Sequence, residues 1–259
     1  MRVLEYGTEN PHVMTMFQCT AEPCWVFEPA ARDVSSDFHV LLFAADGHDE
    51  SGNDFDSVET YARQAADYLR AHDIEAVDLM YGVSLGGATV IRFLAAENIP
   101  VKKAVIDAGI TPYPYPRWIC RLIAAKDFLS ISLATKNMAV MKLAALPDRW
   151  TPAGEDPEEH YRRIFEFEKN HYSYRTIYNA FWSANNYVMP EPVPVLNTVI
   201  EYWYGEGERK ARRRNMEYVR TVFPKTSVRE FRGLAHAELV LMFPKTFHAE
   251  IIRVWQKGT

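Results

Sequence analysis

The sequence is poor in cysteine and contains no long apolar run. Three cysteines, Cys19, Cys24 and Cys120, are a small and odd number for 259 residues, which argues against a disulfide framework and favours a reducing compartment. No uncharged apolar stretch reaches the roughly 18 residues that a membrane span needs. The opening residues, MRVLEYGTENPHV, also lack the apolar segment of a signal peptide. We therefore expect a soluble, cytoplasmic protein with no membrane span.

A strong charge of either sign is absent as well. The formal net charge of -5 is mildly acidic, so there is no electrostatic reason to expect nucleic acid as a partner. The basic stretch ERKARRRNMEYVR (208–220) falls in an expected helix, and we interpret it as a solvated face. With 12 glycines and 15 prolines, the chain is not enriched enough in either residue to be fibrous or disordered.

Short apolar runs alternate with amphipathic stretches along the chain. Runs rich in β-branched and aromatic residues and closed by turn residues predict strands at 12–18, 38–46, 76–83, 101–109, 199–205 and 226–231. Helical periodicity predicts helices at 57–72, 84–98, 206–223 and 238–256, the last interrupted near Pro244. This alternation predicts an α/β protein with a mostly parallel central sheet and helices on both faces.

Residues 110–195 interrupt this alternation at a single point. The segment begins with TPYPYPRWICRL, ends with VMPEPVPV, and is rich in aromatic residues on helical stretches. We interpret it as a helical lid or cap inserted after the strand that ends near Asp107. The core would then comprise residues 1–109 and 196–259. The alternative is that these helices simply cover the sheet.

Ser84 lies between Gly82 and Gly86 in the stretch LMYGVSLGGATVIRFLAA (79–96). A G-x-S-x-G motif has meaning when it joins a strand to a helix, as the expected elements do here. The two glycines leave room for a sharp turn on which the serine backbone is strained and its hydroxyl is exposed. The N–H of Leu85, at the start of the helix, would stabilise an oxyanion. The alternative is a polar residue in a structural turn.

With these features the sequence resembles the α/β-hydrolase-fold proteins over nearly its whole length. The resemblance rests on the turn GVSLGG, on the insertion after the following strand, and on the order serine, acid, histidine along the chain. It implies that Ser84 is the nucleophile. It also implies that His236, in GLAHAEL before the last helix, is the base that activates the serine.

The resemblance leaves the acid open between three carboxylates. Proteins of this family often end the penultimate strand with a G-E-x-D turn, and GEGE (205–208) puts Glu208 in the acid position. Glu206 and Asp107 remain alternatives, because some members take the acid from the preceding strand. Each of them could instead be a carboxylate that favours a helix N-terminus or bonds a loop.

The resemblance further implies that the N–H of Thr20 is the second oxyanion donor. The stretch MFQCTAEPCWVFEP occupies the place of a family H-G-x-x turn that is followed by a Trp. Gln18 and Cys19 replace His and Gly there, so the backbone of this turn is less free. Either side chain could contact substrate, although a small buried hydrophobe is the simpler interpretation of Cys19.

Acidic residues and one histidine crowd the segment AADGHDESGNDFDS (44–57). They are Asp46, His48, Asp49, Glu50, Asp54 and Asp56. The family equivalent is a structural turn, so we expect no metal and no other cofactor.

These features together predict a serine hydrolase for an ester or thioester of a small, mainly apolar substrate. Aromatic lid residues favour such substrates because they supply a large, dry contact surface. Two alternatives remain: the same triad used for C–C hydrolysis or perhydrolysis, and a non-catalytic protein that binds a small ligand on a hydrolase scaffold. A homodimer is compatible with the sequence, which does not indicate an oligomeric state.

Overall fold

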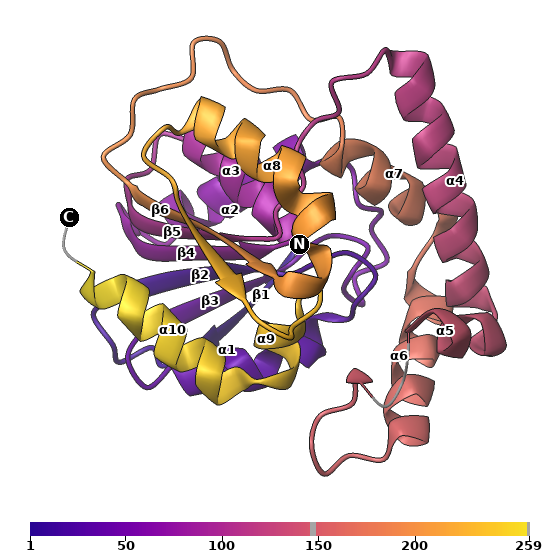
Figure 1. The fold of residues 1–259 in the computed structure, drawn as a ribbon. Coiled ribbons are helices and arrows are strands. Elements are labelled where there is room, and N and C mark those ends of the chain that lie inside the picture. The colour runs from indigo at the N-terminus through magenta and orange to yellow at the C-terminus, as the bar shows by residue number, and fades with distance from the viewer. Residues whose placement is uncertain (146–148, 258–259) are drawn as a thin grey trace.

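A computed structural model describes residues 1–145 and 149–257 (Figure 1). A seven-stranded sheet runs through this part of the chain in the order β1-β3-β2-β4-β5-β6-β7. The strands are β1 (Arg2–Tyr6), β2 (Val13–Phe17), β3 (His39–Ala44), β4 (Val77–Val83), β5 (Val101–Asp107), β6 (Val199–Gly205) and β7 (Ser227–Phe231). Every neighbouring pair is parallel except β1 with β3, which is antiparallel. The predicted α/β fold with a mostly parallel sheet is therefore confirmed.

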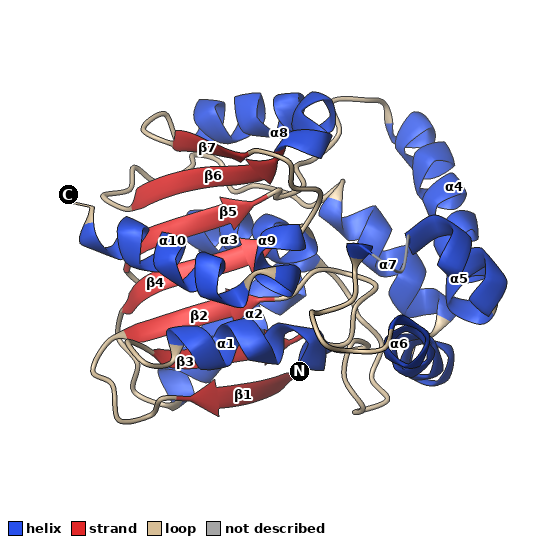
Figure 2. Cartoon of the chain, turned by 60° about the horizontal axis from the view of Figure 1, so that its bottom comes forward, coloured by secondary structure: helices blue, strands red, loops and turns tan. Residues whose placement is uncertain are grey.

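Helices cover both faces of the sheet (Figure 2). Helices α2 (Val58–Ala71), α3 (Leu85–Ala96) and α8 (Arg209–Val222) pack on one face, and α1 (Glu28–Val34) and α10 (Pro244–Gln256) pack on the other. Short elements lie in the turns at the edge of the sheet; they are η1 (Cys24–Phe27), η3 (Glu206–Glu208) and α9 (Glu238–Met242). A hydrophobic core lies on each face of the sheet, and the side chains of β3 alternate between them. Leu41 and Phe43 face one core, and Val40 and Leu42 face the other.

Four α-helices of the described residues lie between β5 and β6. They are α4 (Arg117–Lys136), α5 (Met138–Ala145), α6 (Pro157–His171) and α7 (Tyr174–Ala184), and they stand beside the sheet (Figure 1). They fall in the predicted insertion 110–195, of which residues 146–148 lie outside the described part. Residues 258–259 of the predicted core also lie outside it. That the segment acts as a lid stays a proposal.

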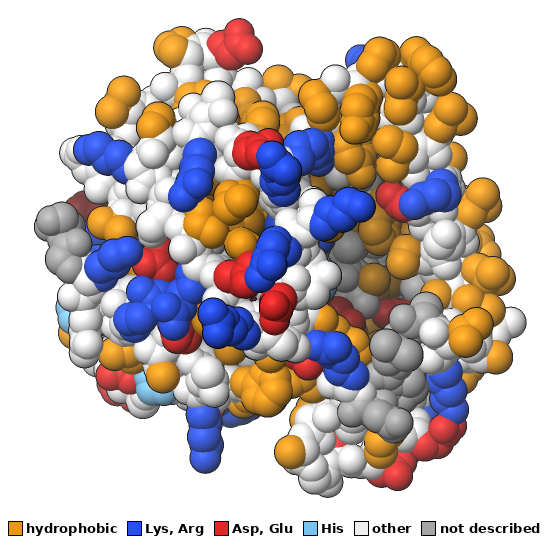
Figure 3. Space-filling model, viewed as in Figure 1, with side chains coloured by type: hydrophobic (Ala, Val, Ile, Leu, Met, Phe, Trp, Pro, Cys, Tyr) orange, Lys and Arg blue, Asp and Glu red, His pale blue; other side chains and the backbone are white. Residues whose placement is uncertain are grey.

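Several aromatic residues of this segment point to solvent. Trp118 on α4 is 64% exposed, and Leu122 and Leu129 on the same helix are exposed too, so apolar side chains gather on the outer side of α4 (Figure 3). The aromatic content of the segment is therefore divided between its outer surface and the interior. Periodicity alone does not indicate which face of such a helix meets the core.

The sequence-based prediction missed β1 and α1. Strand β1 has only five residues and pairs with β3 alone, as an edge strand that is partly exposed. Its side chains include Arg2 and Glu5, which dilute the apolar pattern of RVLEY. Helix α1 has Pro29 in its first turn, and the sequence EPAARDV was not recognised as helical. None of the described helices is both long and apolar enough to cross a bilayer.

A buried ion cluster attaches α10 to the sheet. Glu201 on β6 is almost fully buried, and its carboxylate accepts hydrogen bonds from Arg253 Nη2 at 2.6 Å and from Lys257 Nζ at 2.9 Å. Burial by itself raises the pKa of Glu201, but hydrogen bonds from Arg253 and Trp203 outweigh it and lower the pKa to about 2. The carboxylate therefore stays ionised wherever the protein is folded at ordinary pH.

We expect Arg253→Met to destabilise the protein by about 2–4 kcal/mol, because it leaves a buried carboxylate short of a partner. The stabilisation from a lowered carboxyl pKa is present above the ordinary value of 4.5 and is lost as pH falls towards about 2. Stability of the wild type should therefore fall in this window, and the variant should show a weaker fall. Urea unfolding at several pH values measures both effects.

Arg70→Met is the control, because Arg70 pairs with Asp67 on the surface of α2. That change should cost less than about 1 kcal/mol. Equal losses for the two variants would show that the cluster does not stabilise the fold.

Candidate active site

Ser84 occupies the tight turn between β4 and α3. Its backbone has φ 57° and ψ −110°, which is a strained conformation for a residue with a side chain. Two of its backbone hydrogen bonds tie it to the end of β5: the Ser84 N–H donates to Asp107 O at 2.8 Å, and Ile110 N–H donates to Ser84 O at 3.3 Å. The turn is thus fixed to the end of β5, the neighbouring strand.

The glycines of the motif permit this turn because their neighbours come very close. A Cβ on Gly86 would lie 2.2 Å from the carbonyl oxygen of Phe17, and one on Gly82 would lie 2.3 Å from that of Gly86. Both distances are far below an ordinary van der Waals contact distance. The start of α3 therefore packs directly against the end of β2, which brings Ser84 beside the loop that follows β2.

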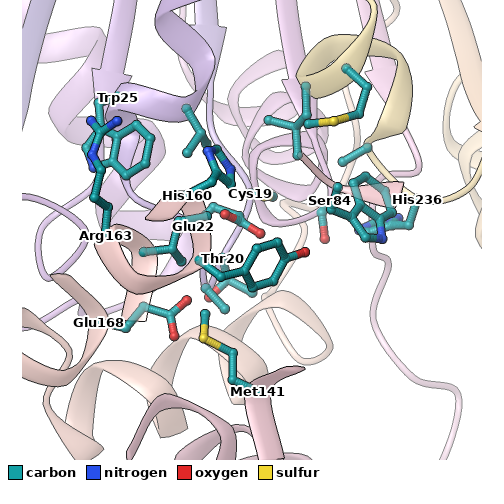
Figure 4. Close-up of a pocket in the computed structure, with 18 of the residues that line it drawn as sticks. Cys19, Thr20, Glu22, Trp25, Ser84, Met141, His160, Arg163, Glu168 and His236 are labelled. Carbon is teal, nitrogen blue, oxygen red and sulfur yellow. The ribbon is translucent and has the colours of Figure 1, made fainter. Parts of the chain in front are cut away.

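A cavity of about 930 Å³ opens at this point. Ser84, Thr20 and His236 line one part, and Thr135, Met141 and Tyr161 of the segment between β5 and β6 line another. Figure 4 shows Ser84 and His236 at the same end of the cavity. The cavity volume is in the range of small-molecule binding sites.

His236 and Glu208 are in direct contact. His236 Nδ1 and Glu208 Oε2 are 2.9 Å apart, and the same oxygen accepts from Arg212 Nε at 2.7 Å. Burial raises the pKa of Glu208, but the hydrogen bond and charge of His236, together with Arg212, lower it to about 2. A permanently ionised carboxylate at Nδ1 leaves Nε2 as the acceptor on the imidazole ring.

The other two candidate acids lie in different surroundings. Asp107 is buried and accepts from the Tyr81 hydroxyl at 2.7 Å, and burial above all raises its pKa to about 6. Glu206 accepts from the backbone N–H of Gly233 at 2.9 Å. Among the described residues neither has a hydrogen bond with His236, so only Glu208 is in place to orient that ring.

Ser84 and His236 are brought to one cavity without a hydrogen bond between them. The described residues include no partner for the Ser84 hydroxyl. Hydrogen bonds of this kind often tighten only when substrate is bound. The geometry is therefore compatible with a serine and a base that meet in the complex.

The predicted oxyanion donors flank Ser84. Leu85 is the first residue of α3, where N–H groups have no partner within the helix. Thr20 lines the cavity, and its hydroxyl is 3.1 Å from His48 Nε2. Cys19 is buried and reaches the cavity wall, whereas Gln18 is buried behind it and donates to Glu22 O at 3.0 Å.

Glu22, Glu168 and His160 also line the cavity, and the sequence analysis did not single them out for this role. His160 is buried and pairs with Glu155, with 2.7 Å between Nδ1 and Oε2. Glu168 lies in α6, where the pattern FEFEKNH gives no sign that one of its charged residues faces inward. One signal in the sequence was usable: Glu168 lies four residues after Ile164, so the two share a helix face, and Ile164 is also on the cavity wall.

The acidic segment 44–57 is held by contacts of its own. Asp46 accepts from Gln64 Nε2 at 2.7 Å and pairs with the N-terminal amine, and Asp49 accepts from the Ser51 hydroxyl at 2.6 Å. Burial lowers the pKa of His48 to about 4, which keeps it neutral. In the described part of the chain no three residues of the metal-binding types come together.

The basic stretch of α8 is paired rather than merely solvated. Arg209 binds Glu230, Arg213 binds Glu217, and Arg214 stacks over the ring of Tyr113. Together with Arg212 beside Glu208, these contacts satisfy most of its charge within the protein.

A model of the alpha/beta hydrolase family matches residues 19–250. The chain therefore belongs to the alpha/beta hydrolase family, as the resemblance of its sequence implies. No curated protein sequence matches it.

Solved structures of low sequence identity share the fold over almost the whole chain. An alpha/beta hydrolase enzyme from a Medee basin deep-sea metagenome library has a TM-score of 0.78 at 12% identity, covering 100% of this chain and 94% of that one. The enol-lactonase from Burkholderia xenovorans LB400 has 0.68 at 15%, covering 99% and 96%. A lipase-esterase related protein from Clostridium acetobutylicum has 0.69 at 13%, covering 98% of each. At these identities the likeness shows the fold alone.

We expect Gly86→Ala to destabilise the protein by about 2 kcal/mol or more, because the new Cβ would overlap the Phe17 carbonyl. Gly207→Ala is the matched control, since a Cβ there would lie 3.4 Å from the nearest atom, Leu234 O. Thermal and urea unfolding compare the two. A Gly86→Ala protein as stable as the control would contradict the close contact described for the turn.

Proposed function

We propose that the protein is a serine hydrolase that cleaves an ester or thioester of a small, mainly apolar substrate. One observation carries the proposal: strained Ser84 shares a cavity with His236, whose Nδ1 lies 2.9 Å from the ionised Glu208. Membership of the alpha/beta hydrolase family supports a hydrolase. The ester or thioester bond and the roles of these residues are our proposal.

In the proposed reaction, His236 Nε2 takes the proton of the Ser84 hydroxyl as its oxygen attacks the acyl carbon. The N–H groups of Leu85 and Thr20 stabilise the oxyanion. His236 then gives the proton to the leaving group, and an acyl-enzyme remains on Ser84. Water, deprotonated by His236, attacks the acyl carbon, releases the acid and restores the serine. Glu208 stabilises the imidazolium in both halves.

The cavity wall supports an apolar chain next to the acyl carbon. Ile110, Ile131, Met141 and Leu241 contribute aliphatic surface, and Trp150 adds an aromatic one. Such a lining excludes water and favours burial of hydrocarbon. The proposed catalytic steps use groups of the chain alone.

We expect a fluorophosphonate to add once to the wild type and not at all to Ser84→Ala, because only an activated serine reacts. Intact mass spectrometry reads out the adduct. Ser130→Ala, on the exposed side of α4, is the control and should label like the wild type. If the wild type binds small ligands but never labels, even with a short acyl probe, the non-catalytic binding protein becomes the better description.

We expect Glu208→Gln to slow labelling and ester turnover at least about 100-fold, because the imidazolium loses its ionised partner. Asp107→Asn should change either rate less than about 5-fold, since Asp107 is not bonded to His236 and the amide can still accept from Tyr81. Initial rates at pH 7 to 8 compare the variants. The reverse order of effects would assign the acid to Asp107.

A further inference from the structure

Two carboxyl groups face the cavity away from Ser84. Glu168 projects from α6 and is only 3% exposed, and Glu22 projects from the loop that follows β2. Figure 4 shows Glu22 and Glu168 among the residues that line the cavity, with Glu168 on the other side of this view from Ser84 and His236. The two groups come from opposite walls, one from the core and one from the segment between β5 and β6.

Neither carboxyl has a partner within the described residues. No hydrogen bond or ion pair reaches the side-chain oxygens of Glu22 or Glu168, and no hydrogen bond joins the two groups. A buried polar group without a partner is costly, and a buried carboxylate more so. Glu168, which is almost fully buried, is therefore placed at an energetic cost that the free protein does not recover, and Glu22 lies half-buried on the other wall.

The other buried glutamates of this chain are paired with cations. Glu201 binds Arg253, Glu208 binds Arg212, and Glu238 binds Arg149 with 2.6 Å between Nη2 and Oε2. Glu22 and Glu168 face the cavity and have no ion pair within the described residues. The missing cation would therefore come from the ligand.

The charge of Lys136 acts on Glu168, but the ammonium group is engaged elsewhere. Its Nζ donates to the backbone oxygens of Lys169 at 2.8 Å, Tyr172 at 3.0 Å and Glu168 at 3.5 Å. These contacts fix the ammonium on the C-terminal end of α6, where carbonyl groups carry partial negative charge. No ion pair within 4.0 Å links it to the Glu168 carboxyl in the described structure.

The pair holds its protons when the cavity is free of a cation. Burial raises the pKa of Glu22 to about 8, and burial together with the Glu22 charge raises that of Glu168 well above its ordinary value. Tyr161, Tyr172 and Cys19 are three of the titratable groups beside them, and burial raises the pKa of each. These neighbours are neutral at pH 7, so a bound cation would meet no competing charge from them.

We propose that Glu22 and Glu168 form a subsite for a protonated amine of the substrate. The inference rests on the proposed function and narrows its substrate class to esters or thioesters that carry an ammonium group beyond an apolar chain. An ammonium has three N–H donors and can bind carboxylate oxygens on both walls of the cavity. The aliphatic residues that line the same cavity accommodate the chain that separates the two ends.

Calorimetric titration of the wild type with pentylammonium and with pentan-1-ol tests the subsite without any catalysis. The two probes share a chain length and differ in charge. We expect pentylammonium to bind at least 10-fold more tightly at pH 7 and to release close to one proton, measured from the heats in two buffers. Equal affinities, or binding without proton release, would overturn the proposal.

Variants test whether pentylammonium binding depends on Glu22 and Glu168 or only on the overall charge of the protein. Glu168→Gln and Glu22→Gln should each weaken pentylammonium binding at least 5-fold and leave pentan-1-ol binding unchanged. Glu166→Gln, on the exposed side of the same helix and paired with Arg162, is the matched control and should change neither. Loss of affinity in the control alone, or in none of the three, would contradict the assignment. Unfolding midpoints of all variants show that each is folded.

Turnover of ethyl 6-aminohexanoate against ethyl heptanoate links the subsite to the reaction. We expect the wild type to favour the amino ester in kcat/KM by at least 10-fold, Glu168→Gln to remove that preference, and Glu166→Gln to keep it. Retained amine binding with no labelling of Ser84 would reject the proposed hydrolase and keep the subsite. Labelling of Ser84 with no amine preference would reject the subsite and keep the hydrolase.

Discussion

The close contact between the start of α3 and the strands beside it is the constraint on which the site depends. A glycine at position 86 lets the helix touch the Phe17 carbonyl, and Gly87 likewise approaches Gly109. Tight packing on both sides over-determines the turn, and this is how Ser84 keeps a conformation that a free chain would avoid. The same contact places the loop after β2, with Thr20, against the serine.

The glutamates discussed above have two kinds of surroundings in this molecule. Where a glutamate supports the fold or a histidine, as Glu201 and Glu208 do, an arginine neutralises it and the carboxylate is ionised. Glu168 faces the cavity with no ion pair among the described residues, and burial raises its pKa well above the ordinary value. Because desolvation penalises an unpaired charge, this difference separates the paired structural carboxylates from those that we propose as a ligand subsite.

The sequence offers three carboxylates as the acid that orients His236, and the structure distinguishes them by their hydrogen-bond partners. Asp107 and Glu208 both lie at carboxyl ends of neighbouring strands, so chain order alone does not choose between them. The Tyr81 hydroxyl donates a hydrogen bond to Asp107, whereas His236 and Arg212 both contact the Glu208 carboxylate. Proximity created by the sheet, rather than the residue type, therefore decides which carboxylate can orient the imidazole.

The sequence by itself determined the sheet, the serine turn and the region of the histidine. Periodicity and turn residues are local signals, and the six strands they predict lie within two residues or so of those found. The family resemblance then ordered the candidate residues. Only the tertiary structure decided that β1 pairs at the edge and that Trp118 faces solvent. It also decided that Glu22 and Glu168, 146 positions apart by number, face one cavity. Such contacts join distant parts of the chain, and no local pattern encodes them.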